Sequence, residues 1–129
     1  RCRAEADGLI VRWYPGVTRE KTVELYRTYR ALLYTLAWDE PFGLVIGEAQ
    51  ACGLPVLTLD RGSMMELVAH GVSGYVCDDI ADVEKILKEG CLAHLKPDDI
   101  VANAQRFSKE AMAHNYLDLF DQVHRQHPW

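Results

Sequence analysis

Several features that would narrow the function of this chain are missing from its sequence. No apolar stretch approaches the roughly 18 to 20 residues that a membrane-spanning helix needs, and no signal-peptide pattern opens the chain. Positive charge is scarce, because 14 Lys and Arg stand against 19 Asp and Glu, for a net charge of −5. The chain therefore offers no overall attraction for nucleic acid or for an anionic membrane. Any anionic ligand needs local hydrogen-bond donors.

The cysteines also form no recognisable site. Cys2, Cys52, Cys77 and Cys91 contain no C-x-x-C pair and no spacing typical of a disulfide framework. Cys52 and Cys77 lie inside apolar runs, where a reduced thiol packs as a small hydrophobic group. This usage favours a reducing, cytoplasmic setting, and we expect no metal site.

Strand-like and helix-like segments alternate along the 129 residues. The strand-like segments are 8–14, 31–36, 55–59 and 74–78; the helix-like segments are 18–30, 42–53, 62–71 and 81–90, followed by two helices that begin near Asp98 and Ser108. Thr18 is a suitable N-cap, Gly53 a suitable helix end, and Ser63 with Glu66 has the spacing of a capping box. The alternation predicts an α/β fold, with a Rossmann-like parallel sheet of about four strands and helices on both faces.

Two glutamates, Glu40 and Glu48, bracket the start of the predicted helix 42–53. The free N–H groups and the positive dipole end of a helix start bind phosphate without any basic side chain. Carboxylates accept hydrogen bonds from vicinal hydroxyl groups. The pattern therefore predicts a nucleoside diphosphate sugar, with its hexose at Glu40, its diphosphate over the amides of Phe42 to Val45, and its ribose at Glu48. Gly43 allows the ligand to approach the backbone closely.

A family resemblance rests on three segments, EPFGLVIGEAQACGLPV, RGSMMELVAHGVSGYVCDD and FSKEAMAHNYLDLF. Together they resemble the C-terminal, donor-binding domain of GT-B glycosyltransferases of group 1, family GT4. The mark of that family is a Glu, seven residues and a second Glu within a longer motif. The matched positions are Glu40, Phe42, Gly43, Leu44, Glu48, Ala49, Ala51, Gly53, Pro55 and Val56. The resemblance extends from about residue 8 to about residue 124.

The resemblance implies a retaining transferase whose donor substrate is a UDP-, GDP- or ADP-sugar and which needs no other cofactor. It assigns no catalytic residue with certainty and no metal ligand. The residues that it implies are Glu40, Phe42, Gly43 and Leu44 for the donor sugar, Gly43, Leu44 and Val45 for the phosphates, Glu48 for the ribose, and Gly16 and Val17 for the nucleobase.

The chain also departs from the family pattern. The Gly-Arg motif and the following Lys that neutralise the diphosphate do not appear, nor do a second strand before 8–14 and the N-terminal, acceptor-binding domain. We therefore expect residues 1–129 to be a single partial nucleotide-sugar-binding domain that lacks activity by itself. For the full-length enzyme we expect a cytoplasmic location, with the inner membrane face as an alternative.

Self-association is a further expectation. The strand 31–36 would have an unpaired edge, and the last helix carries an apolar stripe formed by Met112, Tyr116, Leu119, Phe120 and Val123. Both features favour a homo-oligomer or a rearranged sheet.

One other interpretation stays open at this stage, and a second lacks its sequence signals. The chain is alternatively a catalytically inactive, stand-alone GT-B-like binding or interaction module from a truncated gene. A flavodoxin-like or receiver-like protein would need a Gly/Ser-rich phosphate loop or an acidic cluster at the first strand, and neither is found. Arg61 either approaches a phosphate or is an ordinary surface residue.

Overall fold

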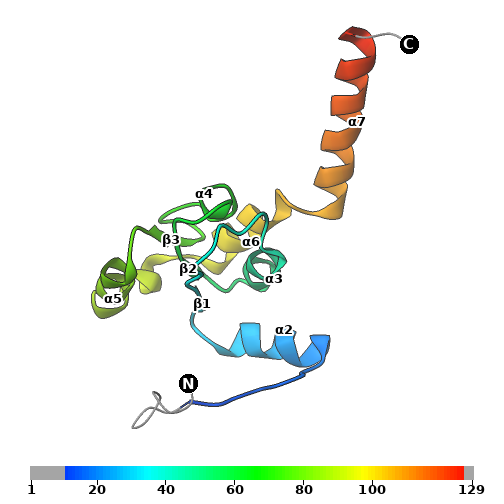
Figure 1. Ribbon diagram of the computed structural model, residues 1–129. Coiled ribbons are helices and arrows are strands. Elements are labelled where there is room, and N and C mark those ends of the chain that lie inside the picture. The colour runs from blue at the N-terminus through cyan, green and yellow to red at the C-terminus, as the bar shows by residue number, and fades with distance from the viewer. Residues whose placement is uncertain (1–10, 127–129) are drawn as a thin grey trace.

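The computed structural model describes residues 11–126. Within this range three short parallel strands form one sheet in the order β1 (Leu32–Tyr34), β2 (Val56–Leu59) and β3 (Gly74–Cys77) (Figure 1). Leu33 pairs with Leu57, and Leu57 pairs with Tyr75. The strands follow one another in the chain and in the sheet, and helical segments connect them, as the alternating pattern predicts.

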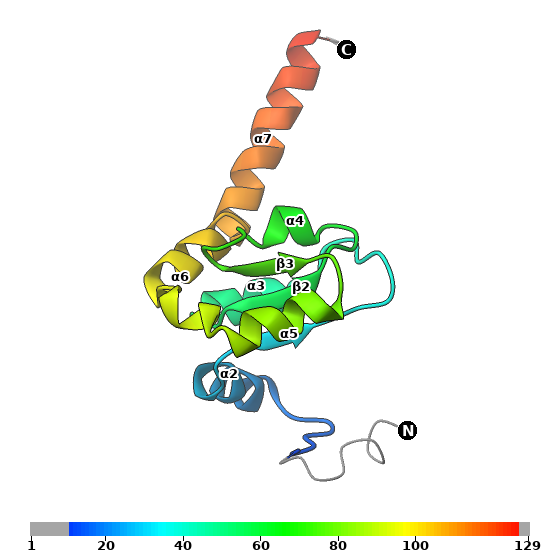
Figure 2. The ribbon, with the colours of Figure 1, turned by 90° about the vertical axis from the view of Figure 1, so that its left-hand side faces the viewer.

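Helices cover both faces of this sheet. They are α2 (Arg19–Thr28), α3 (Leu44–Ala51), α4 (Met64–Leu67), α5 (Ile80–Lys88), α6 (Pro97–Gln105) and α7 (Lys109–Gln126), with a 3-10 turn η1 (Cys91–His94). Figures 1 and 2 show α5 on one side of the strands and α3 on the other. The predicted α/β, Rossmann-like fold is confirmed.

The central strand β2 contributes to two hydrophobic cores, because successive side chains of a strand point to opposite faces. Val56 packs with Ile46 and Ala49 of α3 in the larger core. Leu57 packs with Val83 of α5 in the smaller core on the other face. Both β2 residues are fully buried, so β2 anchors α3 and α5 to the same sheet.

Helix ends agree with their sequence signals. The Thr18 side chain accepts a hydrogen bond of 3.3 Å from the backbone N–H of Lys21 and caps α2. Gly53 follows α3 with a φ of +76°, a conformation in which a side chain is strained. The Ser108 hydroxyl oxygen accepts a hydrogen bond of 3.2 Å from Ala111 N–H at the start of α7.

The predicted strand 8–14 is wrong where the structure describes it. Residues 11–14 form no strand, and residues 8–10 lie outside the described part. A strand needs a neighbour that accepts and donates its backbone hydrogen bonds. Residues 11–14 run instead toward the start of α2, away from β1 (Figure 1). The described sheet therefore has three strands rather than about four.

The predicted capping box of Ser63 and Glu66 is also wrong. Ser63 precedes α4, but its side chain makes no hydrogen bond to the helix. Its hydroxyl donates instead to the backbone oxygen of Glu40, at 3.0 Å. The competing acceptor belongs to a loop that is 23 residues earlier in the chain, which local sequence spacing does not reveal.

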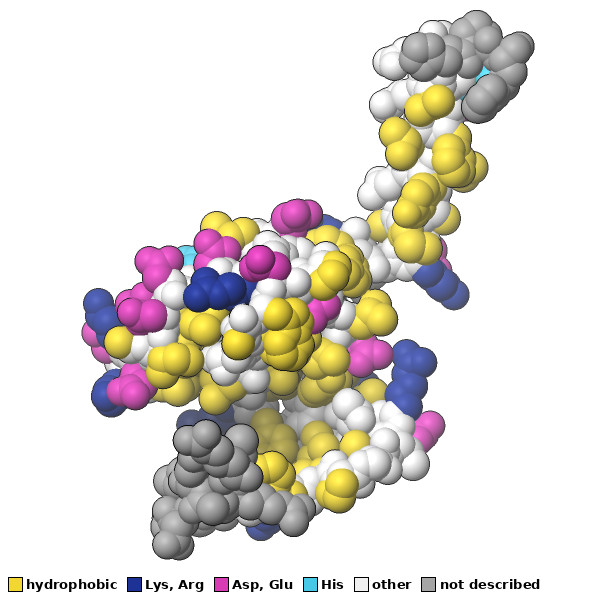
Figure 3. All heavy atoms as spheres, in the orientation of Figure 1, with side chains coloured by type: hydrophobic (Ala, Val, Ile, Leu, Met, Phe, Trp, Pro, Cys, Tyr) yellow, Lys and Arg dark blue, Asp and Glu magenta, His cyan; other side chains and the backbone are white. Residues whose placement is uncertain are grey.

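Helix α7 projects away from the rest of the molecule (Figures 1 and 2), and none of its residues is buried. A row of apolar side chains follows it in the view of Figure 3. The predicted stripe is uncovered, since Met112, Tyr116, Leu119 and Phe120 are each at least half exposed. No helix within residues 11–126 has the length and apolarity to cross a membrane.

Candidate functional site

The loops that follow β1 and β2 meet at the carboxyl edge of the sheet. They comprise residues 35–43 and 60–63. The backbone N–H of Gly62 donates to a carboxylate oxygen of Asp39 at 3.2 Å. Ligands of open parallel sheets bind at this edge, outside the ends of the strands. The sequence-predicted residues Glu40 and Gly43 belong to the first of these loops.

The half-buried carboxylate of Glu40 is held through one of its oxygens. Glu40 Oε2 accepts hydrogen bonds from the Tyr34 hydroxyl at 3.2 Å and from the Trp38 indole nitrogen at 3.3 Å. Oε1 accepts no hydrogen bond from the residues that the structure describes. Burial, and then the charge of Glu40, raise the pKa of Tyr34, so the phenol keeps its proton and acts as a donor. The arrangement leaves Oε1 available to a hydroxyl group of a ligand.

The start of α3 has free backbone donors. Gly43 is the N-cap residue, with φ of 73° and ψ of 65°, and no side chain caps the helix. The first hydrogen bond of this turn runs from Ile46 N to Gly43 O at 2.9 Å. Among the described residues, no acceptor binds the N–H groups of Gly43, Leu44 and Val45. Gly43 is buried, whereas Leu44 and Val45 are exposed, so this helix start next to Glu40 presents chiefly the amides of Leu44 and Val45 to an anion.

Glu48 is exposed on the second turn of α3, while its neighbours Ile46 and Ala49 are buried. Its charge acts on Tyr26 of α2, whose pKa is raised first by burial and then by Glu48. Glu48 thus lies on the side of α3 that faces α2, where its carboxylate is accessible to a ligand.

Gly16 and Val17, the predicted nucleobase residues, lie in the turn before α2. Gly16 has a φ of +60°, and a Cβ atom built on it would meet nothing within 4 Å. Val17 is exposed. No hydrogen bond, ion pair or ring contact joins either described residue to residues 40–48. Their role stays a prediction.

Sequence reasoning missed an aromatic contact beside the helix start. The rings of Phe42 and Phe107 meet edge to face, with centroids 5.9 Å apart and planes at 78°. They line a groove of about 650 Å³ together with Leu44, Met112 and Tyr116, among others. The motif identified Phe42, but no local signal identified Phe107, which follows α6 and packs against the core from there.

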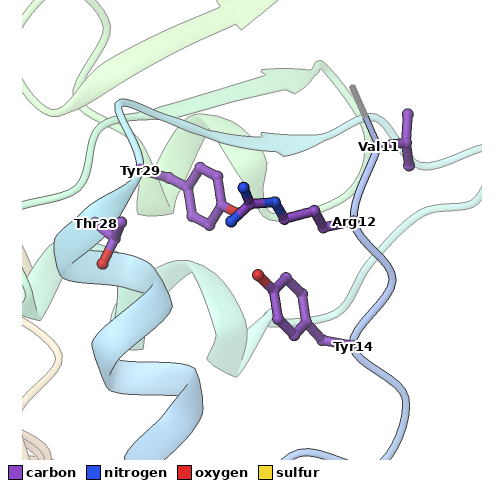
Figure 4. A pocket seen from close by; sticks show the side chains of 5 residues that line it. All are labelled: Val11, Arg12, Tyr14, Thr28 and Tyr29. Carbon is purple, nitrogen blue, oxygen red and sulfur yellow. The ribbon is translucent and has the colours of Figure 1, made fainter. Parts of the chain in front are cut away.

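A second hollow lies between residues 11–14 and the end of α2. It measures about 540 Å³ and is lined by Val11, Arg12, Tyr14, Thr28 and Tyr29. Figure 4 shows Arg12 and Tyr14 pointing toward Tyr29. A hydrogen bond with Tyr29, and then one with Arg12, lower the pKa of Tyr14. None of the lining residues belongs to the loops 35–43 and 60–63, so this hollow is separate from the site at the sheet edge.

Residues 11–126 contain no cluster of side chains that could bind a metal ion. No group of three or more His, Cys, Asp or Glu side chains there is placed to hold an ion. Cys52, Cys77 and Cys91 are free thiols.

Comparison with known families places the candidate site inside a matched segment. The model of the family "Glycosyl transferases group 1" matches residues 1–90. The chain belongs to this family. Its matched segment includes the Glu40 loop, α3, the loop 60–63 and α5, so the candidate site lies within the part of the chain that defines this glycosyltransferase family.

Curated relatives point in the same direction. The D-inositol 3-phosphate glycosyltransferase of Thermobispora bispora is 30% identical over 129 residues, which cover 92% of this chain and 30% of the relative. The enzyme of the same name from Nocardiopsis dassonvillei is 45% identical over 65 residues, 50% of this chain and 15% of the relative. Sucrose synthase 2 of Pisum sativum is 38% identical over 71 residues, 52% of this chain and 9% of the relative. The glycosyltransferase chain thus spans less than a third of the length of these relatives.

Solved structures share the fold. Anabaena HepE in complex with UDP superposes with a TM-score of 0.62 and 27% identity, over 77% of this chain and 29% of HepE. The complex of HepE with UDP-glucose has a TM-score of 0.61 and 26% identity over the same shares.

Proposed function

We propose that this glycosyltransferase domain binds the nucleoside diphosphate sugar donor of a retaining transferase at the carboxyl edge of its sheet. The observation that carries the proposal is the carboxylate of Glu40. It is held on Oε2 and open on Oε1, and it stands beside the uncapped start of α3.

Each part of the donor has a matching group. Oε1 of Glu40 accepts a hydrogen bond from a hydroxyl of the sugar, and the backbone of Phe42, Gly43 and Leu44 lies beside the same ring. The N–H groups of Gly43, Leu44 and Val45 bind the phosphates. Glu48, one turn further along α3, accepts hydrogen bonds from the ribose hydroxyl groups. Gly16 and Val17 contact the base.

A uridine nucleotide is the first donor to test. HepE, which shares 27% of its aligned residues with this chain, has been solved with UDP and with UDP-glucose. These complexes support UDP-glucose, and GDP- and ADP-sugars serve as the comparison. Sugar identity and acceptor depend on contacts beyond this edge.

We expect donor binding without transfer by residues 1–129 alone. The loops 35–43 and 60–63 contain one cationic side chain, Arg61, whose guanidinium donates to the Asp60 carbonyl at 2.6 Å. A helix dipole stabilises a nearby anion by about 0.3 to 1 kcal/mol at an exposed site. Enzymes lower their barriers by about 8 kcal/mol or more. The remaining stabilisation of the leaving diphosphate has to come from other residues of the complete enzyme.

Calorimetric titration of the chain with UDP, UDP-glucose, GDP-mannose and ADP-glucose tests this function. Glu48→Ala removes hydrogen bonds to a charged acceptor, which contribute about 1.5 to 3 kcal/mol, so the Kd for UDP should rise roughly 10-fold to 150-fold. Glu40→Ala should raise the Kd for UDP-glucose by a similar factor and leave the Kd for UDP unchanged.

Glu84→Ala is the matched control. Glu84 lies on α5 and pairs with Lys88, on the face of the sheet opposite α3, so its loss should leave every Kd unchanged. The donor-binding function is refuted if no nucleotide binds at millimolar concentration, or if both site variants bind as the wild type does. The first result would favour the inactive interaction module.

A further inference from the structure

Hydrogen bonds hold both the backbone and the side chain of Glu40. Its backbone oxygen accepts hydrogen bonds from the backbone nitrogen and from the hydroxyl of Ser63, both at 3.0 Å. Its side-chain Oε2 accepts hydrogen bonds from Tyr34 and Trp38. Tyr34 ends β1 and Ser63 follows β2, so two neighbouring strands fix the position of one residue between them.

The hydroxyl of Ser63 binds the backbone of Glu40 and does not cap the helix that follows it. A Ser immediately before a helix usually caps that helix, and loss of such a cap destabilises it. Here α4 has only four residues and receives no side-chain cap from Ser63. The Ser63 hydroxyl donates instead to the backbone oxygen of Glu40, which lies 23 residues earlier in the chain.

Gly62 makes the approach of the two loops close enough for these bonds. It has a φ of +59°, and a Cβ atom built on it would lie 2.6 Å from the Glu40 nitrogen and 2.9 Å from the Asp39 carbonyl carbon. Real Cβ atoms do not approach backbone atoms so closely. The dipeptide Gly62-Ser63 thus supplies both the space and the donors that bind the Glu40 loop.

The loop that carries Glu40 is exposed on either side of it, at Trp38, Asp39, Pro41 and Phe42. Its other contacts are the hydrogen bond from Gly62 N–H to the Asp39 carboxylate and the ring contact of Phe42 with Phe107. The direction of the Glu40 carboxylate therefore depends on the anchor of its backbone together with the two bonds at Oε2. We propose that Ser63 is a positioning residue that holds Glu40 for the sugar of the donor. This inference rests on the proposed function of Glu40.

The experiment compares two serine variants. Ser63→Ala removes the hydroxyl that binds Glu40. Ser73→Ala removes the hydroxyl of a fully buried serine whose oxygen accepts a hydrogen bond of 3.0 Å from Ala69 N–H, away from the Glu40 loop. One neutral hydrogen bond contributes about 1 kcal/mol, so Ser63→Ala should raise the Kd for UDP-glucose about fivefold. The Kd for UDP should stay within about twofold of the wild-type value. Ser73→Ala should not change the ratio of the two Kd values, and Ser63→Thr, which keeps a hydroxyl, should restore it.

A measurement without ligand separates this inference from the proposed function. In a chain with Trp13→Phe and Trp129→Phe, the fluorescence of Trp38 reports the position of the Glu40 carboxylate, to which its indole donates. Ser63→Ala should shift that emission, and Ser73→Ala should not. An unchanged ratio of Kd values together with unchanged emission overturns the role of Ser63. If the wild type binds neither nucleotide, the proposed function fails, and the emission alone decides whether Ser63 holds Glu40.

Discussion

Asn103 of α6 donates a buried hydrogen bond of 2.6 Å to the side-chain oxygen of Gln50 on α3. Both side chains also donate to the backbone oxygen of Leu67 at the end of α4, at 2.8 and 3.2 Å. Arg106 donates to the Asn103 oxygen at 2.8 Å. Every buried polar side-chain atom among the described residues has a partner. This network ties α3, whose start forms the candidate site, to two other elements.

The first prediction is that Asn103→Ala destabilises the fold by about 2 to 4 kcal/mol. The substitution removes two donated bonds and leaves the buried Gln50 oxygen without its partner, and each unsatisfied group costs about 1 to 3 kcal/mol. Urea denaturation measures the change in the free energy of unfolding. Asn115→Ala on the exposed surface of α7 is the control and should stay within about 0.5 kcal/mol of the wild type. Equal effects of the two substitutions would contradict the role of the network.

Gly62 provides the second prediction. Gly62→Ala forces a side chain against the Glu40 backbone, so it should destabilise the fold. It should also weaken the binding of UDP-glucose more than the binding of UDP. Gly71 has a similarly positive φ of +76° but open space around it. Gly71→Ala should therefore cost only about 1 kcal/mol for the backbone conformation and leave the ratio of the two Kd values unchanged. Thermal unfolding and titration of both variants separate the effect of the contact with Glu40 from the effect of the positive φ angle.

The third prediction concerns alkaline pH. Burial raises the pKa values of the Tyr26, Tyr34 and Tyr75 phenols and of the Cys77 thiol above their ordinary values. Above pH 9 to 10 the unfolded chain loses these protons first, so it binds fewer protons than the folded chain. The contribution of these four groups to the free energy of unfolding should therefore fall as the pH rises through this window, by at most about 1.4 kcal/mol per pH unit for each group.

Denaturation curves between pH 8 and pH 11 test the third prediction. In Tyr34→Phe one titrating group is removed, so the decline should be shallower than in the wild type. A stability that is flat or rising above pH 10 would show that these groups are not shielded in the folded state.

Sequence patterns predicted the elements wherever one local signal determined the outcome. The Thr18 cap, the Gly53 helix end and the start of α7 after Ser108 each depend on residues within four positions of one another. The failures share a different cause. The strand 8–14 required a neighbouring strand, and the capping box required that Ser63 have no better acceptor than its own helix.

The sequence motif predicts which residues form the candidate site, and their roles stay a prediction. It selects Glu40, Gly43 and Glu48 because their types and spacing would suit a ligand with two hydroxyl-rich ends, but it does not reveal what holds Glu40 in place. The groups that hold Glu40 come from β1 and from the loop after β2, through bonds such as the one from Ser63. Such contacts depend on which loops the sheet brings together, and spacing along the chain does not encode that.

The fourth prediction is that the chain self-associates through the apolar stripe of α7. Most of the stability of a helix in a protein comes from the packing of its apolar face, and on α7 the stripe residues Tyr116, Leu119 and Phe120 are 54%, 50% and 62% exposed. Light scattering at increasing concentration should give masses above 14.6 kDa. Leu119→Glu with Phe120→Glu places two charges in the stripe and should restore the monomer. His114→Glu is the control, because the exposed His114 lies on the opposite side of α7, about 160° around the helix from Met112, and should leave association unchanged. A wild-type chain that is monomeric at high concentration would contradict the prediction, because the stripe would then tolerate water without a partner.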